Sequence, residues 1–222
     1  MIQNYSEGHQ IMSEFVNFPK IARLNRDCVV SEKLDGKNAA IQIVEATSET
    51  PYDFFTDPNL IEFVTSDGVE YAVFAQSRNK FITPGKSTDN YGFAGWVQRN
   101  ARALVETLGV GTHFGEWWGA GIQRKYGLTG DDKRFSLFNT RRWTFNDPQL
   151  TAIPGLNAVP VLYEGPFDTL YINDLVDFLS ADGSAASPGF LKPEGVVIYN
   201  TAAKTYFKVT CENDEKPKGQ NR

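Results

Sequence analysis

Alternating apolar and polar residues predict short β-strands along most of the chain. The first two strands flank a polar segment that contains Gly36. Two later strands flank Ser66-Asp67-Gly68, a sequence typical of a hairpin turn. The strands are predicted at 28–33, 39–46, 60–65, 70–76, 112–118, 134–139, 159–164, 194–199 and 205–209. Many of them follow one another directly, which favours antiparallel pairing.

Two helices are predicted where apolar residues recur at steps of three and four. The first begins near Asp89 and ends at Gly109, a residue typical of a helix end. The second runs from Asp168, a suitable N-cap, to about Ser180. The glycine- and serine-containing segment 182–189 is predicted to be a flexible loop. Together these elements predict an α+β fold with substantially antiparallel sheets.

Composition places the chain among ordinary globular proteins. Its 222 residues are 41% hydrophobic and 22% charged, which fits one large domain or two small ones. The net charge of −5 does not indicate nucleic-acid binding, although a local basic face would still allow it. The two cysteines and two histidines match no metal-ligand spacing. No apolar run reaches membrane-spanning length and no signal peptide is apparent, so a soluble intracellular protein is predicted.

One charged segment joins the first two predicted strands: Glu32-Lys33-Leu34-Asp35-Gly36-Lys37-Asn38. In an extended chain, residues two apart share a face, so Lys33 and Asp35 are expected to project together. Gly36 would let the backbone approach a ligand closely. The arrangement suits a lysine that attacks a phosphate. Taken alone, however, the segment is better explained by a surface Lys–Asp pair before a glycine turn.

Three later segments place single charges in apolar surroundings. Glu116 lies among aromatic residues in a predicted strand, and Glu194 precedes a glycine and a buried strand. Lys208 lies in the aromatic run Tyr206-Phe207-Lys208-Val209. Such charges are costly to bury unless they are paired or bind a ligand. Each segment is ordinary by itself, and the order of all four is the informative feature.

This order resembles the covalent nucleotidyltransferases, the superfamily of DNA ligases, RNA ligases and mRNA capping enzymes. DNA ligases and capping enzymes usually carry an arginine where this chain has Asn38, so the chain is most similar to the RNA-ligase branch. The paired tryptophans after Glu116 are similar to those of phage and bacterial RNA-ligase-like proteins. The matches extend from residue 32 to residue 208.

The resemblance implies a nucleotidyltransferase (ATP-grasp-like ligase adenylation) domain over residues 1–212. Two antiparallel sheets flanked by helices would hold the nucleotide in the groove between them. A polar C-terminal tail would follow at 213–222, with no additional OB fold or other C-terminal domain.

The activity implied by the resemblance is that of an ATP-dependent RNA ligase, which joins a 3′-hydroxyl to a 5′-phosphate. Lys33 would carry AMP covalently, an adenylated 5′ end would follow, and Glu194 would support Mg²⁺ or Mn²⁺. Phe135 lies on the same predicted strand as Phe138, so the aromatic contact could belong to either ring, and a core role suits either as well. The implied catalytic residues are Lys33, Asp35, Glu194 and Lys208, and the implied nucleotide contacts are Glu32, Asn38, Arg78, Glu116 and Phe138.

The last segment departs from the family pattern by one positive charge. The family offers two lysines two residues apart there, whereas Lys208 has Tyr206 and Thr210 at those positions. Lys204 is about 13 Å away along an extended strand, too far to contact the same phosphate. A free lysine amine has a pKa near ~10.4, so a lysine nucleophile benefits from cationic neighbours. Lys208 and Arg78 are the candidates for that role.

The sequence leaves two other functions open. A small DNA nick ligase is the first alternative, and Asn38 is the feature that favours RNA over it. A non-catalytic nucleotide- or RNA-binding module of the same fold is the second, supported by the missing lysine. The expected partners are RNA ends and no membrane, and either the domain acts alone or a partner protein helps to grip the substrate. The expected location is cytoplasmic. One possible origin of the protein is a phage, in which case it would act in a bacterial host.

Overall fold

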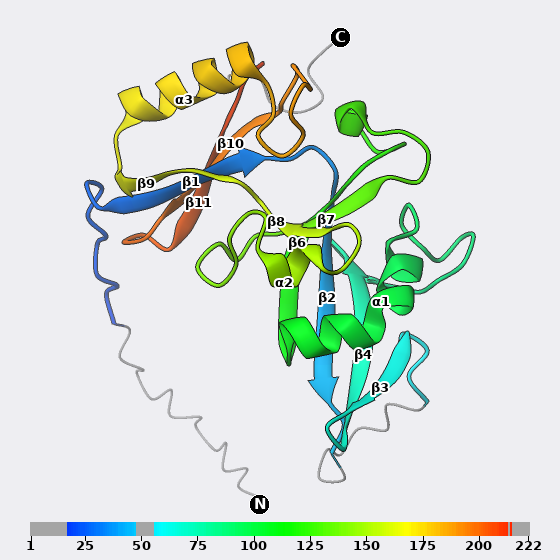
Figure 1. Ribbon diagram of the computed structural model, residues 1–222. Helices are drawn as coiled ribbons and strands as arrows, with labels where there is room; N and C mark the ends of the chain where they lie inside the picture. Colours follow the sequence, from blue (N-terminus) through cyan, green and yellow to red (C-terminus); the bar gives the residue numbers. More distant parts are fainter. Residues whose placement is uncertain (1–16, 48–55, 213, 215–222) are drawn as a thin grey trace, which may run out of the picture.

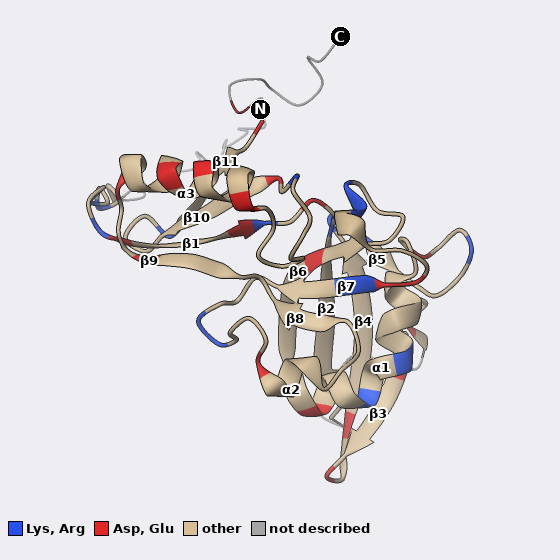
Figure 2. Ribbon diagram, turned by 45° about the horizontal axis from the view of Figure 1, so that its top comes forward, with Lys and Arg blue, Asp and Glu red and all other residues tan. Residues whose placement is uncertain are grey.

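The computed structural model describes residues 17–47, 56–212 and 214, which form two β-sheets with helices packed against them (Figure 1). The smaller sheet has four strands in the order β11-β10-β1-β9. These are β1 (Asp27–Lys33), β9 (Val161–Pro166), β10 (Gly195–Asn200) and β11 (Thr205–Thr210). Helix α3 (Thr169–Asp182) packs on one face of this sheet through Ile172, Val176 and Leu179. Figure 2 marks acidic residues at several positions along α3.

The larger sheet has the order β3-β4-β2-β6-β7-β8, with β5 paired to β4. Helix α1 (Phe93–Leu108) packs on it, and the helices α2 (Pro148–Thr151) and η2 (Lys125–Gly127) lie in its connections. The pairing is antiparallel except between β7 and β8, so the predicted α+β fold is confirmed. Its strands are β2 (Lys37–Glu45), β3 (Glu62–Ser66), β4 (Val69–Ser77), β5 (Phe81–Ile82), β6 (Gly111–Gly119), β7 (Lys133–Leu137) and β8 (Leu156–Ala158).

Helix α1 shows why the apolar spacing was informative. Phe93, Trp96 and Leu104 are buried in the main core, as their spacing predicts. The helix begins four residues later than predicted, because Asp89 lies before the first turn and contacts the turn through its side chain. The Asp89 carboxylate accepts hydrogen bonds from the amides of Ala94 and Gly95, at 2.8 and 3.0 Å, and so satisfies donors of the first turn.

The chain crosses between the two sheets at two places. The first crossing is Leu34–Gly36, between β1 and β2, and the second is Val159–Pro160, between β8 and β9. The strand predicted at 159–164 was therefore wrong in its start, because Pro160 separates strands that belong to different sheets. The first crossing carries the charged segment, so Lys33 ends the smaller sheet and Lys37 begins the larger one.

Two other predictions need correction. The predicted strand 134–139 ends at Leu137, so Phe138 and Asn139 lie beyond it. The segment predicted as a flexible loop after α3 is packed into the fold, with Ser184, Ala186 and Ser187 buried. The polar tail predicted at 213–222 lies outside the described residues except for Asp214. Within residues 17–47, 56–212 and 214, no helix has the length and apolar character of a membrane span.

Candidate active site

A pocket of about 520 Å³ lies beside the first crossing, where the two sheets meet. Its walls come from residues 33–38, the turn between β4 and β5, β6, and the segment that precedes β10. Six of the residues predicted for the site line this one pocket: Lys33, Asp35, Asn38, Arg78, Glu116 and Glu194. Residues separated by up to 161 positions in the chain are thus brought together.

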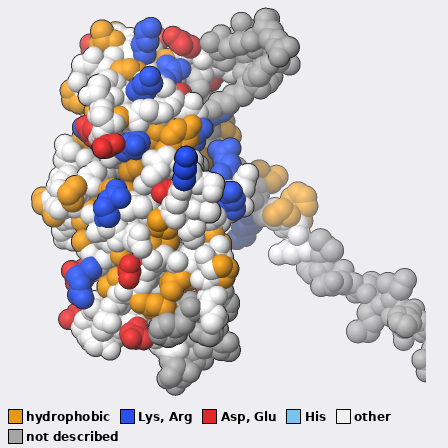
Figure 3. Space-filling model, turned by 90° about the vertical axis from the view of Figure 1, so that its right-hand side faces the viewer, with side chains coloured by type: hydrophobic (Ala, Val, Ile, Leu, Met, Phe, Trp, Pro, Cys, Tyr) orange, Lys and Arg blue, Asp and Glu red, His pale blue; other side chains and the backbone are white. Residues whose placement is uncertain are grey.

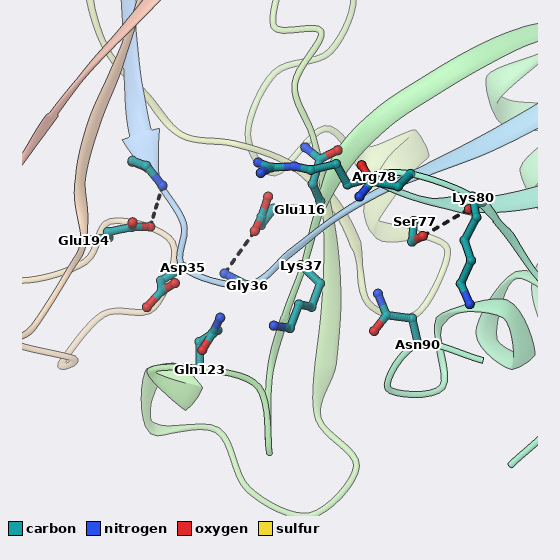
Figure 4. Close-up of a pocket in the computed structure, with 13 residues that line it drawn as sticks. Asp35, Gly36, Lys37, Ser77, Arg78, Lys80, Asn90, Glu116, Gln123 and Glu194 are labelled. Carbon is teal, nitrogen blue, oxygen red and sulfur yellow. Dashed lines mark hydrogen bonds and ion pairs between the residues drawn. The ribbon is translucent and has the colours of Figure 1, made fainter. Parts of the chain in front are cut away.

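The ammonium group of Lys33 forms an ion pair with Glu194. Lys33 Nζ lies 2.6 Å from Glu194 Oε2, and the two side chains are 19% and 7% exposed. Strand pairing explains the contact, because Lys33 lies opposite Gly195 in the register of β1 and β10. Gly195 has φ 147°, and a Cβ there would collide with the carbonyl oxygen of Val209 in β11. The pair is therefore held where three strands approach closely (Figure 4).

Glu116 faces the crossing from β6. Its Oε1 accepts a hydrogen bond of 3.0 Å from the amide of Gly36. Burial raises the pKa of Glu116 to about 7, even though the Lys33 charge and the Gly36 hydrogen bond act to lower it. A Cβ on Gly36 would lie 2.8 Å from Trp118 Cβ and would collide with the carbonyl oxygen of Trp117. Glycine is thus required for the crossing to reach Glu116.

Asp35 is held by a segment that sequence reasoning missed, the connection between β6 and β7. Arg124 Nε lies 3.3 Å from Asp35 Oδ2, and Arg124 Nη1 donates to the carbonyls of Lys192 and Pro193, at 3.0 and 3.3 Å. Tyr126 Oη accepts from the Asp35 amide at 2.9 Å. One arginine therefore joins the first crossing to the residues just before Glu194.

Further polar residues line the pocket on the side of the larger sheet. Asn38 lies opposite Glu116 in the register of β2 and β6, so both project from the same face. Arg78 follows the end of β4, in a turn closed by hydrogen bonds from Ser77 to the Lys80 carbonyl. Lining residues that sequence reasoning missed are Lys37, Ser77, Asn79, Lys80, Asn90 and Gln123. No local pattern marks them, except that Lys37 adjoins Gly36.

Three residues predicted for the site do not line this pocket. Glu32 faces the other side of β1, where its Oε2 accepts from the Ala186 amide at 2.9 Å. Burial raises the pKa of the Glu32 carboxyl, despite hydrogen bonds from Ser184 and the backbone. Phe138 packs in a cluster that includes Leu34, the residue next to Lys33. The alternative ring, Phe135, is fully buried in the main core, so a nucleotide contact by Phe135 is excluded.

Lys208 is the third residue outside the pocket. It is exposed on the edge strand β11, opposite Val197, which in turn lies opposite Ser31 of β1. Directly opposed residues share a face, so Lys208 lies on the same face as Lys33. The strand spacings put their Cα atoms about 12 Å apart, two strands across and two residues along. Both side chains could reach a phosphate placed between them. Lys33 and Lys208 do not line a common pocket, however.

The carboxylates of the pocket suit a divalent cation that takes only some of its oxygen ligands from the protein. Asp35, Glu116 and Glu194 offer the oxygen donors that Mg²⁺ and Mn²⁺ prefer. Over the part of the chain that the structure describes, no three His, Cys, Asp or Glu side chains come close enough together to hold a metal ion. The donor set therefore fits an ion that takes most of its ligands from phosphates and water, not one bound by protein alone.

Comparisons with known proteins bear on the fold and the family of this chain. A search of curated proteins found no significant match. Among solved structures, the chain is similar to the RNA ligase of Naegleria gruberi: an apo variant and a variant with AMP and Mn each have a TM-score of 0.50 and 16% identity. The matches cover 84% of this chain and 50% of theirs, so the chain spans about half their length. At this identity the likeness establishes the fold alone.

The family itself is established by a sequence match over most of the chain. The model of the family described as RNA ligase matches residues 26–210. This range contains both sheets and every residue that lines the pocket. The chain therefore belongs to the RNA ligase family.

Proposed function

We propose that this protein is an ATP-dependent RNA ligase that joins a 3′-hydroxyl end to a 5′-phosphate end. The observation that carries the proposal is the Lys33–Glu194 pair at 2.6 Å, in a pocket shared with Asp35, Glu116 and Asn38. Family membership and the AMP- and Mn-bound state of the similar Naegleria structure support it. Lys33 is the only lysine of the pocket that is ion-paired, among the residues that the structure describes.

The first step is attack of Lys33 Nζ on the α-phosphorus of ATP. The Lys33 ammonium first loses a proton to give the neutral amine, an N–P bond then forms as the P–O bond to pyrophosphate breaks, and the nitrogen loses a second proton to give the phosphoramidate. Glu194 Oε2 is the hydrogen-bond acceptor placed at the first of these protons. The Glu116 carboxylate would accept hydrogen bonds from ribose hydroxyls, and Arg78 would contact phosphate. Phe138, in the cluster beside Leu34, remains the proposed aromatic contact of adenine, and Lys208, on the edge strand β11 outside the pocket, remains the proposed additional cation.

Two transfers complete the reaction. A 5′-phosphate oxygen attacks the phosphorus of lysyl-AMP, the N–P bond breaks, and Lys33 regains its proton as the RNA end becomes adenylated. The 3′-hydroxyl then loses its proton, attacks the 5′-phosphate, and AMP leaves. Asp35 and Asn38 line the same pocket as Lys33 and would position these ends. A divalent cation near Glu194, when bound, would neutralise phosphate charge.

The test is covalent labelling with α-labelled ATP and Mg²⁺ or Mn²⁺, followed by a denaturing gel. The wild-type protein should carry label, and Lys33→Ala and Lys33→Arg should carry none. Lys33→Arg keeps the charge opposite Glu194 but is not a usable nucleophile, so it separates loss of chemistry from loss of folding. Label that persists in both variants, or a folded wild-type protein that takes none, would overturn the proposal.

The choice between RNA and DNA needs a second measurement. Nicked duplexes that differ only in RNA or DNA on the 3′-hydroxyl side should be compared for sealing. Faster sealing of the RNA form is expected, and Asn38→Arg should reduce that preference. Equal or faster sealing of DNA would instead assign the protein as a DNA nick ligase.

A further inference from the structure

The pocket extends to the α1 side of the larger sheet, where the proposed chemistry uses none of its residues. Lys37 follows Gly36 and lies opposite Trp117, so it faces away from its neighbour Asn38. Figure 4 shows Lys37, Lys80 and Asn90 together on one side of the β2 chain, with Glu116 on the other. Within the described ranges, neither lysine has a carboxylate within ion-pair distance.

An exposed tyrosine adjoins these lysines. The side chain of Tyr91 is 49% exposed, and the Lys37 ammonium lies 5.6 Å from the centre of its ring. Tyr91 has φ 54°, in the left-handed region that residues other than glycine and asparagine seldom adopt.

The surrounding structure holds Tyr91 in that conformation. The indole of the buried Trp117 donates to the Tyr91 carbonyl at 3.2 Å. On the preceding side, Asp89 accepts from the amides of Asn90 and Ala94, at 2.6 and 2.8 Å. Strained backbone that is fixed from both sides is characteristic of ligand clamps. The ring is thus presented to solvent at the edge of the pocket and not buried in the core.

We propose that Tyr91, Lys37 and Lys80 form a docking site for a single RNA strand. An exposed ring on which a base stacks, next to cations that contact the backbone, is the usual arrangement for binding single strands. Asn90 adds an amide that can bond to phosphate or ribose. The proposal rests on the proposed function, since a strand held here would extend around the β2 chain toward Lys33.

The position of these cations is relevant to the second lysine of the family pattern, which is missing next to Lys208 in β11. Lys37, Arg78 and Lys80 line the same pocket, on the wall of the larger sheet. Figure 3 shows Lys and Arg side chains across the middle of one face of the molecule, although the net charge is −5. In this chain the cations available to bind phosphate in the pocket therefore lie mainly on the larger sheet.

The experiment measures binding of a fluorescent single-stranded RNA oligonucleotide without a 5′-phosphate, by anisotropy, at several salt concentrations. Tyr91→Asn removes the ring but tolerates the left-handed backbone, and should weaken binding about 5- to 150-fold through loss of one stacked base. Tyr91→Phe should bind as the wild type does. Lys37→Ala with Lys80→Ala should lower the slope of log affinity against log salt by about 1.4, as expected for two phosphate contacts.

The matched control is Phe178→Ala, which removes an aromatic side chain that is 59% exposed on α3. It should leave RNA affinity unchanged. The site is refuted if Tyr91→Asn binds RNA within twofold of wild type, or if wild type binds no RNA. It is equally refuted if lysyl-AMP formation falls as far as RNA affinity does, since Tyr91 would then brace the adenylation pocket. Failure of the proposed function would appear separately, as absence of lysyl-AMP in wild type.

Discussion

The two ends of the pocket hold their charges differently. Near β1 and β10, Lys33 is paired with Glu194 at 2.6 Å, and Asp35 with Arg124 at 3.3 Å. Near β4 and α1, Lys37 and Lys80 project into the pocket without a carboxylate partner among the described residues. One end is an internally neutralised network, and the other is an open cationic surface.

This difference suits two kinds of task. Side chains that take part in chemistry must be held in one geometry, and ion pairs and hydrogen bonds with low exposure do this. A cation that binds an external phosphate is more useful without an internal partner, because the ligand then displaces only water and counterions. The paired end is therefore expected to govern reaction rates, and the open end to govern affinity for anionic ligands.

The largest effect should come from breaking the paired end at Glu194. Glu194→Ala removes the acceptor that holds Lys33 Nζ, and should slow lysyl-AMP formation at least ~100-fold, the scale of a lost proton acceptor. The measurement is the rate of labelling by α-labelled ATP. Glu164→Ala, on the exposed surface of β9, should label at the wild-type rate. A rate for Glu194→Ala within threefold of wild type would mean that the pair is merely structural.

The next effect concerns the crossing that joins the two ends. Gly36→Ala would force a Cβ against Trp117 and Trp118, and should lower the free energy of unfolding by about 1–3 kcal/mol. Urea denaturation measures it. The matched change Gly95→Ala lies inside α1, where the nearest atom is the flexible end of Arg99 at 3.4 Å. That variant should gain up to about 1 kcal/mol from helix propensity. Equal stability of the two variants would contradict the close packing at Gly36.

A smaller effect should distinguish the two ends of the pocket through the pH dependence of the affinity for ATP. The pKa of Glu116 is about 7, and only its ionised form accepts hydrogen bonds from two ribose hydroxyls through both oxygens. Affinity for ATP should therefore fall roughly tenfold from pH 8 to pH 6, as the carboxylate becomes protonated. Glu116→Gln should bind weakly with a flatter profile, which also shows the contribution of ATP's own titration. Identical profiles for the two proteins would remove Glu116 from the nucleotide site.

Sequence patterns predicted local features of this fold well, and long-range ones poorly. The apolar spacing of α1 and the glycine turn between β3 and β4 depend on neighbouring residues, and both are confirmed. The break at Pro160 was missed, because the apolar run 158–163 continues across it while the strands change sheets. Phe135 and Phe138 could not be separated until the end of β7 was known. Phe135 lies within β7 and is buried in the main core, whereas Phe138 follows the strand and packs in the cluster that contains Leu34.

The candidate site divides in the same way. Glu116 and Glu194 were found because each is a charge in or next to an apolar strand, and Lys33 because it lies in a charged segment between two strands, in an order that resembles the family pattern. Arg124 and Tyr91 lie in turns whose sequences are unremarkable, and their positions depend on contacts with Asp35 and Trp117. Glu32 was assigned from its place beside Lys33, whereas strand alternation turns its side chain to the opposite face.

The smallest effect should come from Arg124, which connects the crossing to the residues before Glu194. Arg124→Gln should slow lysyl-AMP formation about fivefold, since each lost charged hydrogen bond shifts positions without removing a reacting group. Arg124→Lys should lie between this variant and wild type, because one ammonium replaces the two separate nitrogens by which Arg124 contacts Asp35 and the Pro193 carbonyl. A double-mutant cycle with Asp35→Asn measures the coupling directly. Strict additivity would show that Arg124 supports the fold without positioning Asp35, and the paired end would then reduce to Lys33 and Glu194.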